Sequence, residues 1–499
     1  MTWKKKIFIS GILGAAFLFM VSCINLDVDP PFPDTQNIYG TTQEMIDAAG
    51  LLYRNWYNAA HALKGPALGL AAAADQITSL KSNAGIRDLA KEPRVAFNNI
   101  TDYSYLYITK NFWTDMYRVS LTANDILRVI QNKDRVLQTN GVDAKPMLQA
   151  WAYFIRGIGY GYLGLLFDQA TVIDVNTPLP VKNFSDYHEV IDFALASLDS
   201  AIVISQRNSF TLPESYIRGY QLTSSDLAAI ASGYAARILI SAPRNDLDNL
   251  RNDWQKIKDY AIAAWTQDLA PDTDNDNWKD EYKRNGAYPE WAYTDLRIIH
   301  LLDNHFPARW PEDNVSWDTD SGTEPDSSYL HSDDARATTD FAWVKKLKPE
   351  NPFYLNSFYR YKRYDNWLSY SAGPSPELTV TETNLILAEA ETMLNNLSEA
   401  ITIINNGTRT QRGQLSPIDA GADKITILNA IFYERDIELM FTGAGTSFFD
   451  MRRRDMLQTG TPLHFPVPAG DLEILEMDIY TFGGVENADG INTSNGGWF

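Results

Sequence analysis

The sequence predicts a mainly α-helical protein, in which a tetratricopeptide-like helix-turn-helix frame carries one large, loop-rich insertion. Apolar residues recur with the 3.6-residue period of a helix through most of residues 41–270 and 376–460. No segment keeps the apolar–polar alternation of a half-buried strand over any length. Residues 271–375 lose the helical period and are rich in Asp, Asn, Pro, Gly and aromatic residues.

The first 22 residues have the layout of a secretory signal peptide. Three lysines at 4–6 precede a nearly uncharged apolar stretch at 7–21, which is short for a membrane span of about 20 residues. The stretch leads to Cys23, the only cysteine, in the order Met-Val-Ser-Cys that resembles a bacterial lipobox. We therefore predict a lipid on Cys23. The alternative is an ordinary buried cysteine inside an uncleaved membrane helix.

Residues 23–40 are predicted to form an extended tether, because they are acidic and contain prolines at 30, 31 and 33. Acidic residues soon after a lipid-bearing cysteine resemble the surface-export signal of some outer-membrane lipoproteins. The expected location is therefore the outer membrane, facing the exterior. Residues 41–499 are then predicted to be a single domain.

The charge and the aromatic content bear on the class of partner. The formal net charge is −20, so a phosphate backbone would be repelled and nucleic acid is excluded as an expected partner. Aromatic residues make up 12% of the chain, with 13 Trp and 26 Tyr. Exposed Trp and Tyr rings stack on sugar faces, although packing in the core explains most such rings equally well.

The helices of the frame are predicted in order from their apolar spacing and their caps. A capping box at Thr41-Thr42-Gln43-Glu44 precedes the first helix. Gly157 and Gly161 lower helix propensity, so we expect them to allow close approach of neighbouring helices. The predicted helices span 111–130, 145–166, 187–204, 224–239, 254–266, 381–394, 398–405 and 422–441.

The insertion at 271–375 is far longer than an ordinary connection between helices. Its aromatic content argues against disorder, so a functional role is expected. It begins with Asp272-x-Asp274-x-Asp276, like a calcium-binding EF-hand loop, but Asn277 and Lys283 replace the glycine and the bidentate glutamate of that loop. No metal site is predicted, and calcium stays open as an alternative.

Charged residues near the end of the frame mix acids and bases at helical spacing. We expect them to form i,i+4 pairs and helix-end contacts rather than a catalytic centre. These residues are Glu434, Arg435, Glu438, Asp450, Arg452 and Arg453.

Several segments resemble, in the same order, those of the SusD/RagB family of outer-membrane nutrient-binding lipoproteins. Residues 111–124 contain the Trp, Tyr and Ala-Asn pattern of one family helix, and residues 388–405 are similar to its helix-turn-helix pair. The closest match is Glu-Arg-Asp-Ile-Glu-Leu at 434–439 followed by Phe-Asp-Met-Arg-Arg at 449–453. The resemblance runs from the lipobox to the C-terminus and weakens only within 271–375.

The sequence has no His-Glu-x-x-His, Gly-x-Ser-x-Gly or phosphate-cradling glycine loop, so we predict neither an enzyme nor a cofactor beyond the lipid. The resemblance adds an expected role. The helical frame would pack against a SusC-like, TonB-dependent transporter, and the variable loops would bind an oligosaccharide or polysaccharide for delivery. The ligand-binding candidates are the insertion's aromatic residues that stand among polar, turn-forming neighbours, although each is as well explained by packing within the loops. They are Trp278, Tyr282, Trp291, Trp310, Trp317 and Tyr329.

Three alternatives stay open. Some relatives are linked to peptides rather than glycans, so the cargo could be a peptide. The chain could also be mainly an assembly part of the transporter, with little ligand affinity of its own. A glycoside hydrolase needs only two well-placed carboxylates, and sequence spacing does not exclude such a pair among 63 acidic residues.

Overall fold

The computed structural model describes residues 39–78, 85–132, 135–178, 181, 183–289, 291–310, 330–344, 354–370, 372–487, 494 and 496–498. The predicted signal peptide, Cys23 and nearly all of the tether lie outside the described residues. All described helices and strands belong to the unit formed by residues 42–499. None of the helices in the described part of the chain combines the length and the apolarity of a membrane span.

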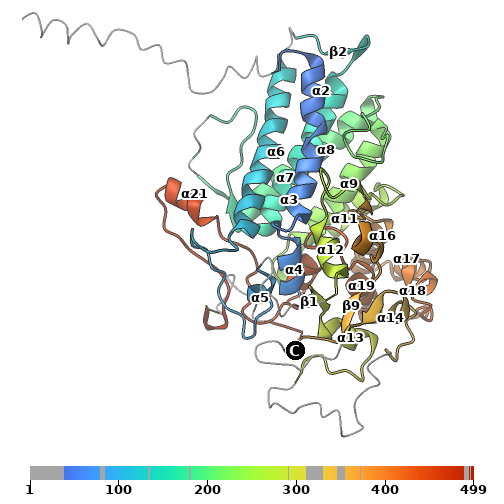
Figure 1. The fold of residues 1–499 in the computed structure, drawn as a ribbon. Helices are drawn as coiled ribbons and strands as arrows, with labels where there is room; N and C mark the ends of the chain where they lie inside the picture. Colours follow the sequence, from blue (N-terminus) through green and yellow to red (C-terminus); the bar gives the residue numbers. More distant parts are fainter. Residues whose placement is uncertain are drawn as a thin grey trace, which may run out of the picture. The chain divides into compact units, whose positions relative to one another are not determined.

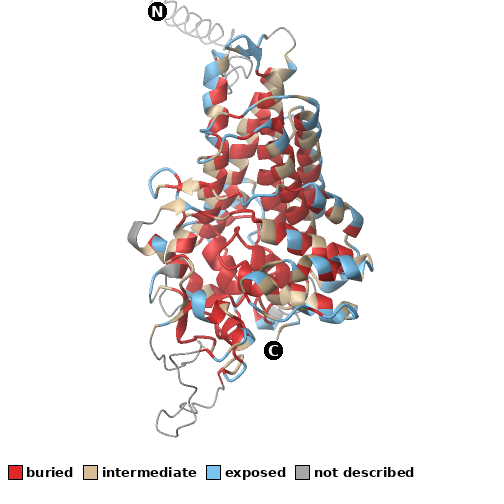
Figure 2. Cartoon of the chain, turned by 90° about the vertical axis from the view of Figure 1, so that its right-hand side faces the viewer, coloured by how far each residue is buried: buried red, intermediate tan, exposed pale blue. Residues whose placement is uncertain are grey.

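The first part of the frame is a layer of helices that run side by side (Figure 1). Four long helices, α6 to α9, make up most of this layer, and buried residues form their inner faces (Figure 2). The helices are α2 (Thr42–Gly50), α3 (Leu52–His61), α4 (Ala67–Ala73), α5 (Ile86–Leu89), α6 (Tyr107–Gln131), α7 (Lys145–Leu166), α8 (Tyr187–Arg207), α9 (Ser224–Ser241), α10 (Asp246–Leu250) and α11 (Trp254–Ile262).

Side-chain caps explain where two of these helices begin. The Asp186 carboxylate accepts hydrogen bonds from the first free amides of α8. Thr223 and Asp226 form a reciprocal capping box at the start of α9. Each cap satisfies amide groups that have no partner inside the helix, so the helix starts are set locally by the sequence.

Glycines in α7 allow its neighbours to pack closely. A Cβ atom on Gly157 would lie 2.6 Å from Cγ of Leu198 in α8, and one on Gly161 would collide with Ile238 of α9. A larger side chain at either position would force the packed helices apart. The expected role of these glycines in close helix approach is confirmed.

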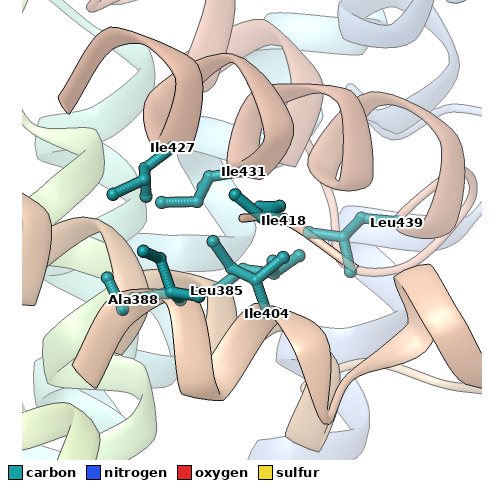
Figure 3. Close-up of a cluster of buried hydrophobic side chains, with 9 residues drawn as sticks. Leu385, Ala388, Ile404, Ile418, Ile427, Ile431 and Leu439 are labelled. Carbon is teal, nitrogen blue, oxygen red and sulfur yellow. The ribbon is translucent and has the colours of Figure 1, made fainter. Parts of the chain in front are cut away.

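The second part of the frame contains the predicted helix-turn-helix pair, α16 and α17, packed against α19. Buried aliphatic side chains from these helices and from Ile418 form one apolar cluster between them (Figure 3). The later helices are α12 (Glu281–Ala287), α13 (Leu296–Leu302), α14 (Arg336–Thr339), α15 (Asn366–Tyr370), α16 (Val380–Met393), α17 (Leu397–Asn405), α18 (Thr408–Gln411), α19 (Lys424–Glu438), α20 (Thr446–Arg452) and α21 (Ala469–Ile474), with a 3₁₀ turn at Val485–Asn487.

Short antiparallel strand pairs supplement the helices in the described residues. The pair β6 (Asp272–Thr273) and β10 (Gly373–Pro374) joins the two ends of the 271–375 segment, so this segment leaves and rejoins the frame at one place. The other pairs are β1 (Ile77–Thr78) with β7 (Tyr293–Thr294), β2 (Gln138–Thr139) with β3 (Val142–Asp143), β4 (Gln169–Ala170) with β5 (Ser185–Asp186), and β8 (Phe341–Trp343) with β9 (Tyr359–Tyr361). The mainly α-helical fold class is confirmed.

Candidate functional site

Three of the six aromatic candidates lie in the interior. Trp278, Tyr282 and Trp310 are only 5%, 3% and 1% exposed. The indole ring of Trp278 packs against the rings of Tyr53 and Tyr57, with centroids 6.2 and 5.9 Å away. These three rings therefore offer no open face to a ligand in this structure.

Their contacts are those of loop packing, the alternative explanation for each aromatic. The indole N–H of Trp310 donates to the carbonyl oxygen of Asn356 at 2.7 Å. The Tyr282 ring lies 4.8 Å from the ring of Phe441, and burial raises the pKa of its hydroxyl. Two further candidates, Trp317 and Tyr329, lie outside the described residues.

Trp291 differs, because it forms an accessible pair with Tyr288. The two ring centroids are 4.5 Å apart and the planes are inclined by 30°. Tyr288 is 38% exposed and Trp291 is half-buried. The guanidinium group of Arg284 lies 5.8 Å from the Trp291 ring centroid and forms an ion pair of 3.0 Å with Glu281. We call Tyr288 and Trp291 the aromatic pair.

The local sequence explains the position of the aromatic pair. Asp280 caps the start of α12 by accepting from the Lys283 amide at 2.8 Å. The helix ends at Ala287, and Tyr288 after it has an extended backbone, because Pro289 disfavours the helical conformation of the residue before it. The amide of Trp291 then donates to the Tyr288 carbonyl at 3.2 Å, which closes a turn before β7. The turn places both rings at the edge of the 271–375 segment.

The sequence prediction missed Tyr288. Its position directly before Pro289 and three residues before Trp291 is a turn signal that could have identified it. Trp343, at the end of β8, was also not among the predicted site residues, and it is 43% exposed. Both residues belong to the 271–375 segment.

A second group of residues has the composition of an acid–base centre. It consists of six side chains that are at most 2% exposed, which we call the buried polar cluster: His61, Arg237, Asp280, Lys283, Glu377 and Glu382. Glu377 bonds to His61 Nε2 and to Arg237 Nη1, both at 2.6 Å. Arg237 Nη2 lies 2.6 Å from Glu382, and Lys283 Nζ lies 3.0 Å from Asp280.

The electrostatics of the buried polar cluster favour charged carboxylates. Burial acts to raise the pKa of Asp280, but Lys283 and His61 outweigh it and lower that pKa to about 2. Burial likewise acts to raise the pKa of Glu377, and Arg237 and His61 lower it overall. Asp280 and Glu377 are therefore held ionised by the buried cations beside them.

The buried polar cluster attaches the 271–375 segment to the frame. Asp280 near the start of this segment accepts hydrogen bonds from Tyr57 at 2.8 Å and from Ser375 at 2.5 Å. Glu377, just beyond its other end, bonds to α3 and α9 through His61 and Arg237. Because none of these side chains reaches the surface, their arrangement fastens the segment and does not present reactive groups to a bound molecule.

The charged motif residues near the end of the frame also form buried ion pairs. Arg336 binds both oxygens of Glu434 at 2.8 Å, and Arg453 binds both oxygens of Glu389 at 2.5 and 2.7 Å. The structural role expected for these residues agrees with their contacts. Arg453 also pairs with Asp450, three residues earlier, at 3.0 Å, and Arg452 donates to the carbonyls of Leu165 and Ser241 near the ends of α7 and α9. The helix-end contacts are therefore present, whereas the ion pairs of Arg336 and Glu389 join different elements instead of i,i+4 neighbours.

The EF-hand-like segment is arranged as a turn. One oxygen of Asp274 accepts from the amides of Asp276, Asn277 and Trp278 at 2.7–2.9 Å, and the other pairs with Arg218. Within the described ranges, no group of three or more His, Cys, Asp or Glu residues is placed to share a metal ion.

Comparison with known proteins identifies related chains. The model of the SusD family matches residues 247–465. No curated protein sequence matches the chain.

Solved structures share the fold. A SusD superfamily protein from Parabacteroides distasonis ATCC 8503 is 15% identical, with a TM-score of 0.58 over 87% of this chain and 97% of that chain. A SusD homolog from Bacteroides thetaiotaomicron VPI-5482 is 14% identical, with a TM-score of 0.58 over 90% and 98%. A SusD-like carbohydrate binding protein from Bacteroides vulgatus ATCC 8482 is 19% identical, with a TM-score of 0.55 over 85% and 86%.

Proposed function

This chain is a SusD/RagB family protein, and from that premise we propose that it binds an oligosaccharide or polysaccharide outside the cell and delivers it to a SusC-like, TonB-dependent transporter. The observation that carries the binding step is the accessible aromatic pair at the edge of the 271–375 segment. A structural relative described as a carbohydrate binding protein supports the same class of ligand. Copurification of such a transporter with the full-length chain from membranes tests the delivery step.

The aromatic pair suits a sugar for a physical reason. The flat apolar face of a pyranose ring packs on an aromatic ring, and its hydroxyl groups stay in water or bond to polar neighbours. Arg284 and Glu281 stand beside Trp291 and supply both donors and acceptors for hydroxyl groups. A shallow platform of this kind fits a long polymer that must be held and then released.

Replacing Trp291 or Tyr288 with Ala should weaken glycan binding by about tenfold or more, because each change removes stacking surface. Isothermal titration of residues 24–499 against a glycan panel measures the effect. Tyr107→Ala is the matched control, since Tyr107 is a half-buried tyrosine outside the 271–375 segment.

Three outcomes of this titration would contradict the glycan proposal or its site. Absence of binding to every glycan would exclude glycan binding by the isolated chain. Binding only to a peptide pool would establish the peptide alternative instead. Unchanged affinity in both variants would move the glycan site away from the aromatic pair, and released reducing ends would indicate a hydrolase.

The proposed location depends on the N-terminal segment. We propose that residues 1–22 are removed, that Cys23 carries the lipid and that residues 23–40 tether the protein to the outer membrane, facing the exterior. Cells fed labelled palmitate should label the wild-type chain and the control Ser22→Ala, but not Cys23→Ala, because Cys23 is the only cysteine. Labelling of Cys23→Ala would overturn the proposed anchor.

A further inference from the structure

A cleft of about 670 Å³ lies between α10, α13, α16, α19 and the C-terminal segment at Trp498. Its volume is that of a site for a small organic ligand. Neither the aromatic pair nor any residue of α12 lines it. The cleft is therefore a separate place from the proposed glycan platform.

The walls of the cleft are largely apolar. Met393, Phe432 and Met456 line its interior, and Leu250 and Leu301 border it with exposures of 54% and 37%. Methionine side chains adapt to ligands of different shape. These walls fit an aliphatic or aromatic group better than a sugar, whose hydroxyl groups need a dense set of polar partners.

Two of the acids that line the cleft are already neutralised by buried arginines. Both oxygens of Asp436 accept from Arg297, at 3.1 and 3.2 Å. Both oxygens of Glu389 are bound by Arg453. A third acid, Asp246, is exposed to solvent, where water screens its charge.

Arg454 also lines the cleft, and two of its guanidinium nitrogens can donate hydrogen bonds to a ligand. Its Nε donates to the Asp450 carbonyl at 2.9 Å, and its guanidinium carbon lies 4.1 Å from the ring centroid of Phe432. Nη1 and Nη2 of Arg454 make no hydrogen bond to the described residues. Burial lowers the pKa of the Arg454 guanidinium group, against the charges of Asp436 and Asp450 that raise it. An arginine keeps its proton at neutral pH, so the group offers a planar fork that matches a carboxylate.

We propose that this cleft binds an organic carboxylate with an apolar body. The carboxylate pairs with the free edge of Arg454, and the apolar part packs against Phe432, Met393 and Met456. The same chemistry is found in a free aryl or aliphatic acid and in the C-terminal residue of a peptide. Glycan binding at the aromatic pair is not required for this site, so each proposal can fail without the other.

Calorimetry with 3-phenylpropanoate and its neutral amide at pH 7 and 0.15 M salt tests the site on residues 24–499. The acid should bind at least about tenfold more tightly than the amide. Arg454→Met should weaken binding of the acid by about tenfold or more and leave the amide unchanged. Arg409→Met is the matched control, because Arg409 is also half-buried and its Nε also donates to one backbone carbonyl, that of Ser416.

A second variant keeps Arg454 in place. Asn429 is exposed on α19 and lines the cleft, so Asn429→Trp should fill the cleft and abolish binding without disturbing the core. Equal affinity for the acid and the amide, no binding of the acid, or unchanged binding in Arg454→Met or Asn429→Trp would overturn the proposal. Circular dichroism confirms that each variant is folded.

The peptide acetyl-Ala-Ala-Phe, as free acid and as amide, distinguishes the two sources of the carboxylate. Tighter binding of the peptide acid than of 3-phenylpropanoate, with loss in the peptide amide, supports a peptide C-terminus as the ligand. Binding of 3-phenylpropanoate alone supports a free acid.

Discussion

Replacing Arg237 with Met should lower the free energy of unfolding by about 3–5 kcal/mol. Arg237 is 2% exposed and binds both Glu377 and Glu382, which are fully buried. Its removal leaves Glu382 without this cation and leaves Glu377 with the hydrogen bonds to His61 and Tyr234. A buried carboxylate without a cation either keeps an unfavourable charge or must take up a proton.

Chemical denaturation at pH 7 measures this effect, with Arg118→Met as the matched control. Arg118 pairs with Asp115 on the surface of α6, and its side chain is 65% exposed. A surface pair of this kind contributes at most about 1 kcal/mol, so the control should unfold almost like the wild type. Equal unfolding free energies for the two variants would contradict the anchoring role of the buried polar cluster.

Asp168 should stabilise the folded protein increasingly as the pH falls from 7 to 5. Burial raises the pKa of Asp168 to about 6, against the hydrogen bond from Tyr480. A carboxyl group with a raised pKa takes up its proton more readily in the folded protein than in the unfolded chain. This carboxyl group alone should therefore raise the free energy of unfolding by about 1.3 kcal/mol as the pH falls from 7 to 5. His464 acts in the opposite direction, because burial holds the pKa of its imidazole well below the usual value.

At lower pH, the buried polar cluster should cause a change opposite to that of Asp168. The pKa of Asp280 is about 2 in the folded protein, below its usual value of about 3.9. Its contribution of about 2 kcal/mol is present above pH 4 and is lost as the pH falls toward 2. The carboxyls of Glu377 and Asp450, whose pKa values are also lowered, add losses of the same sign.

Urea denaturation at pH 7, 5 and 3 tests both limbs of this profile. Asp168→Asn should lack the contribution of about 1.3 kcal/mol that the wild type gains between pH 7 and 5, and should keep the loss of stability between pH 5 and 3. The same change in the free energy of unfolding between pH 7 and 5 in the wild type and in Asp168→Asn would contradict the role of Asp168. Unchanged stability between pH 5 and 3 would contradict the role of the buried polar cluster.

Many helices of the frame could be predicted because their signals are local. The helix predicted at 145–166 has those bounds in the structure, and α9 begins at the predicted residue behind its capping box. The predictions of helix ends were less accurate, because the helix predicted at 254–266 ends at Ile262. Apolar spacing continues past an end, whereas the actual end depends on contacts with other elements.

The 271–375 segment was predictable as an insertion but not in its internal structure. Its described part contains α12 to α15, which are four to seven residues long, too short to show a helical period. Its strands have two or three residues each; β7 pairs with β1 of the frame, β6 pairs with β10 at the other end of the segment, and β8 pairs with β9. Such short elements are stabilised by tertiary contacts. Their own sequences therefore contain little periodicity from which they could be predicted.

The local sequence also did not indicate which of the aromatic candidates would be exposed. Trp278 and Trp291 both stand among polar, turn-forming residues, yet only Trp291 retains accessible ring surface in the structure. Burial of Trp278 depends on Tyr53 and Tyr57, which lie more than 200 residues earlier in the chain. No local pattern contains that information.

By itself, the sequence determined the helical class, many of the helix starts and the place of the insertion, because periodicity and caps act between neighbouring residues. It also carried the lipobox-like signal at Cys23 and the resemblance to the SusD/RagB family. Only the tertiary structure decided which rings are exposed, which charges pair and where the Arg454 cleft opens. Each of these depends on side chains that folding brings together from distant parts of the chain.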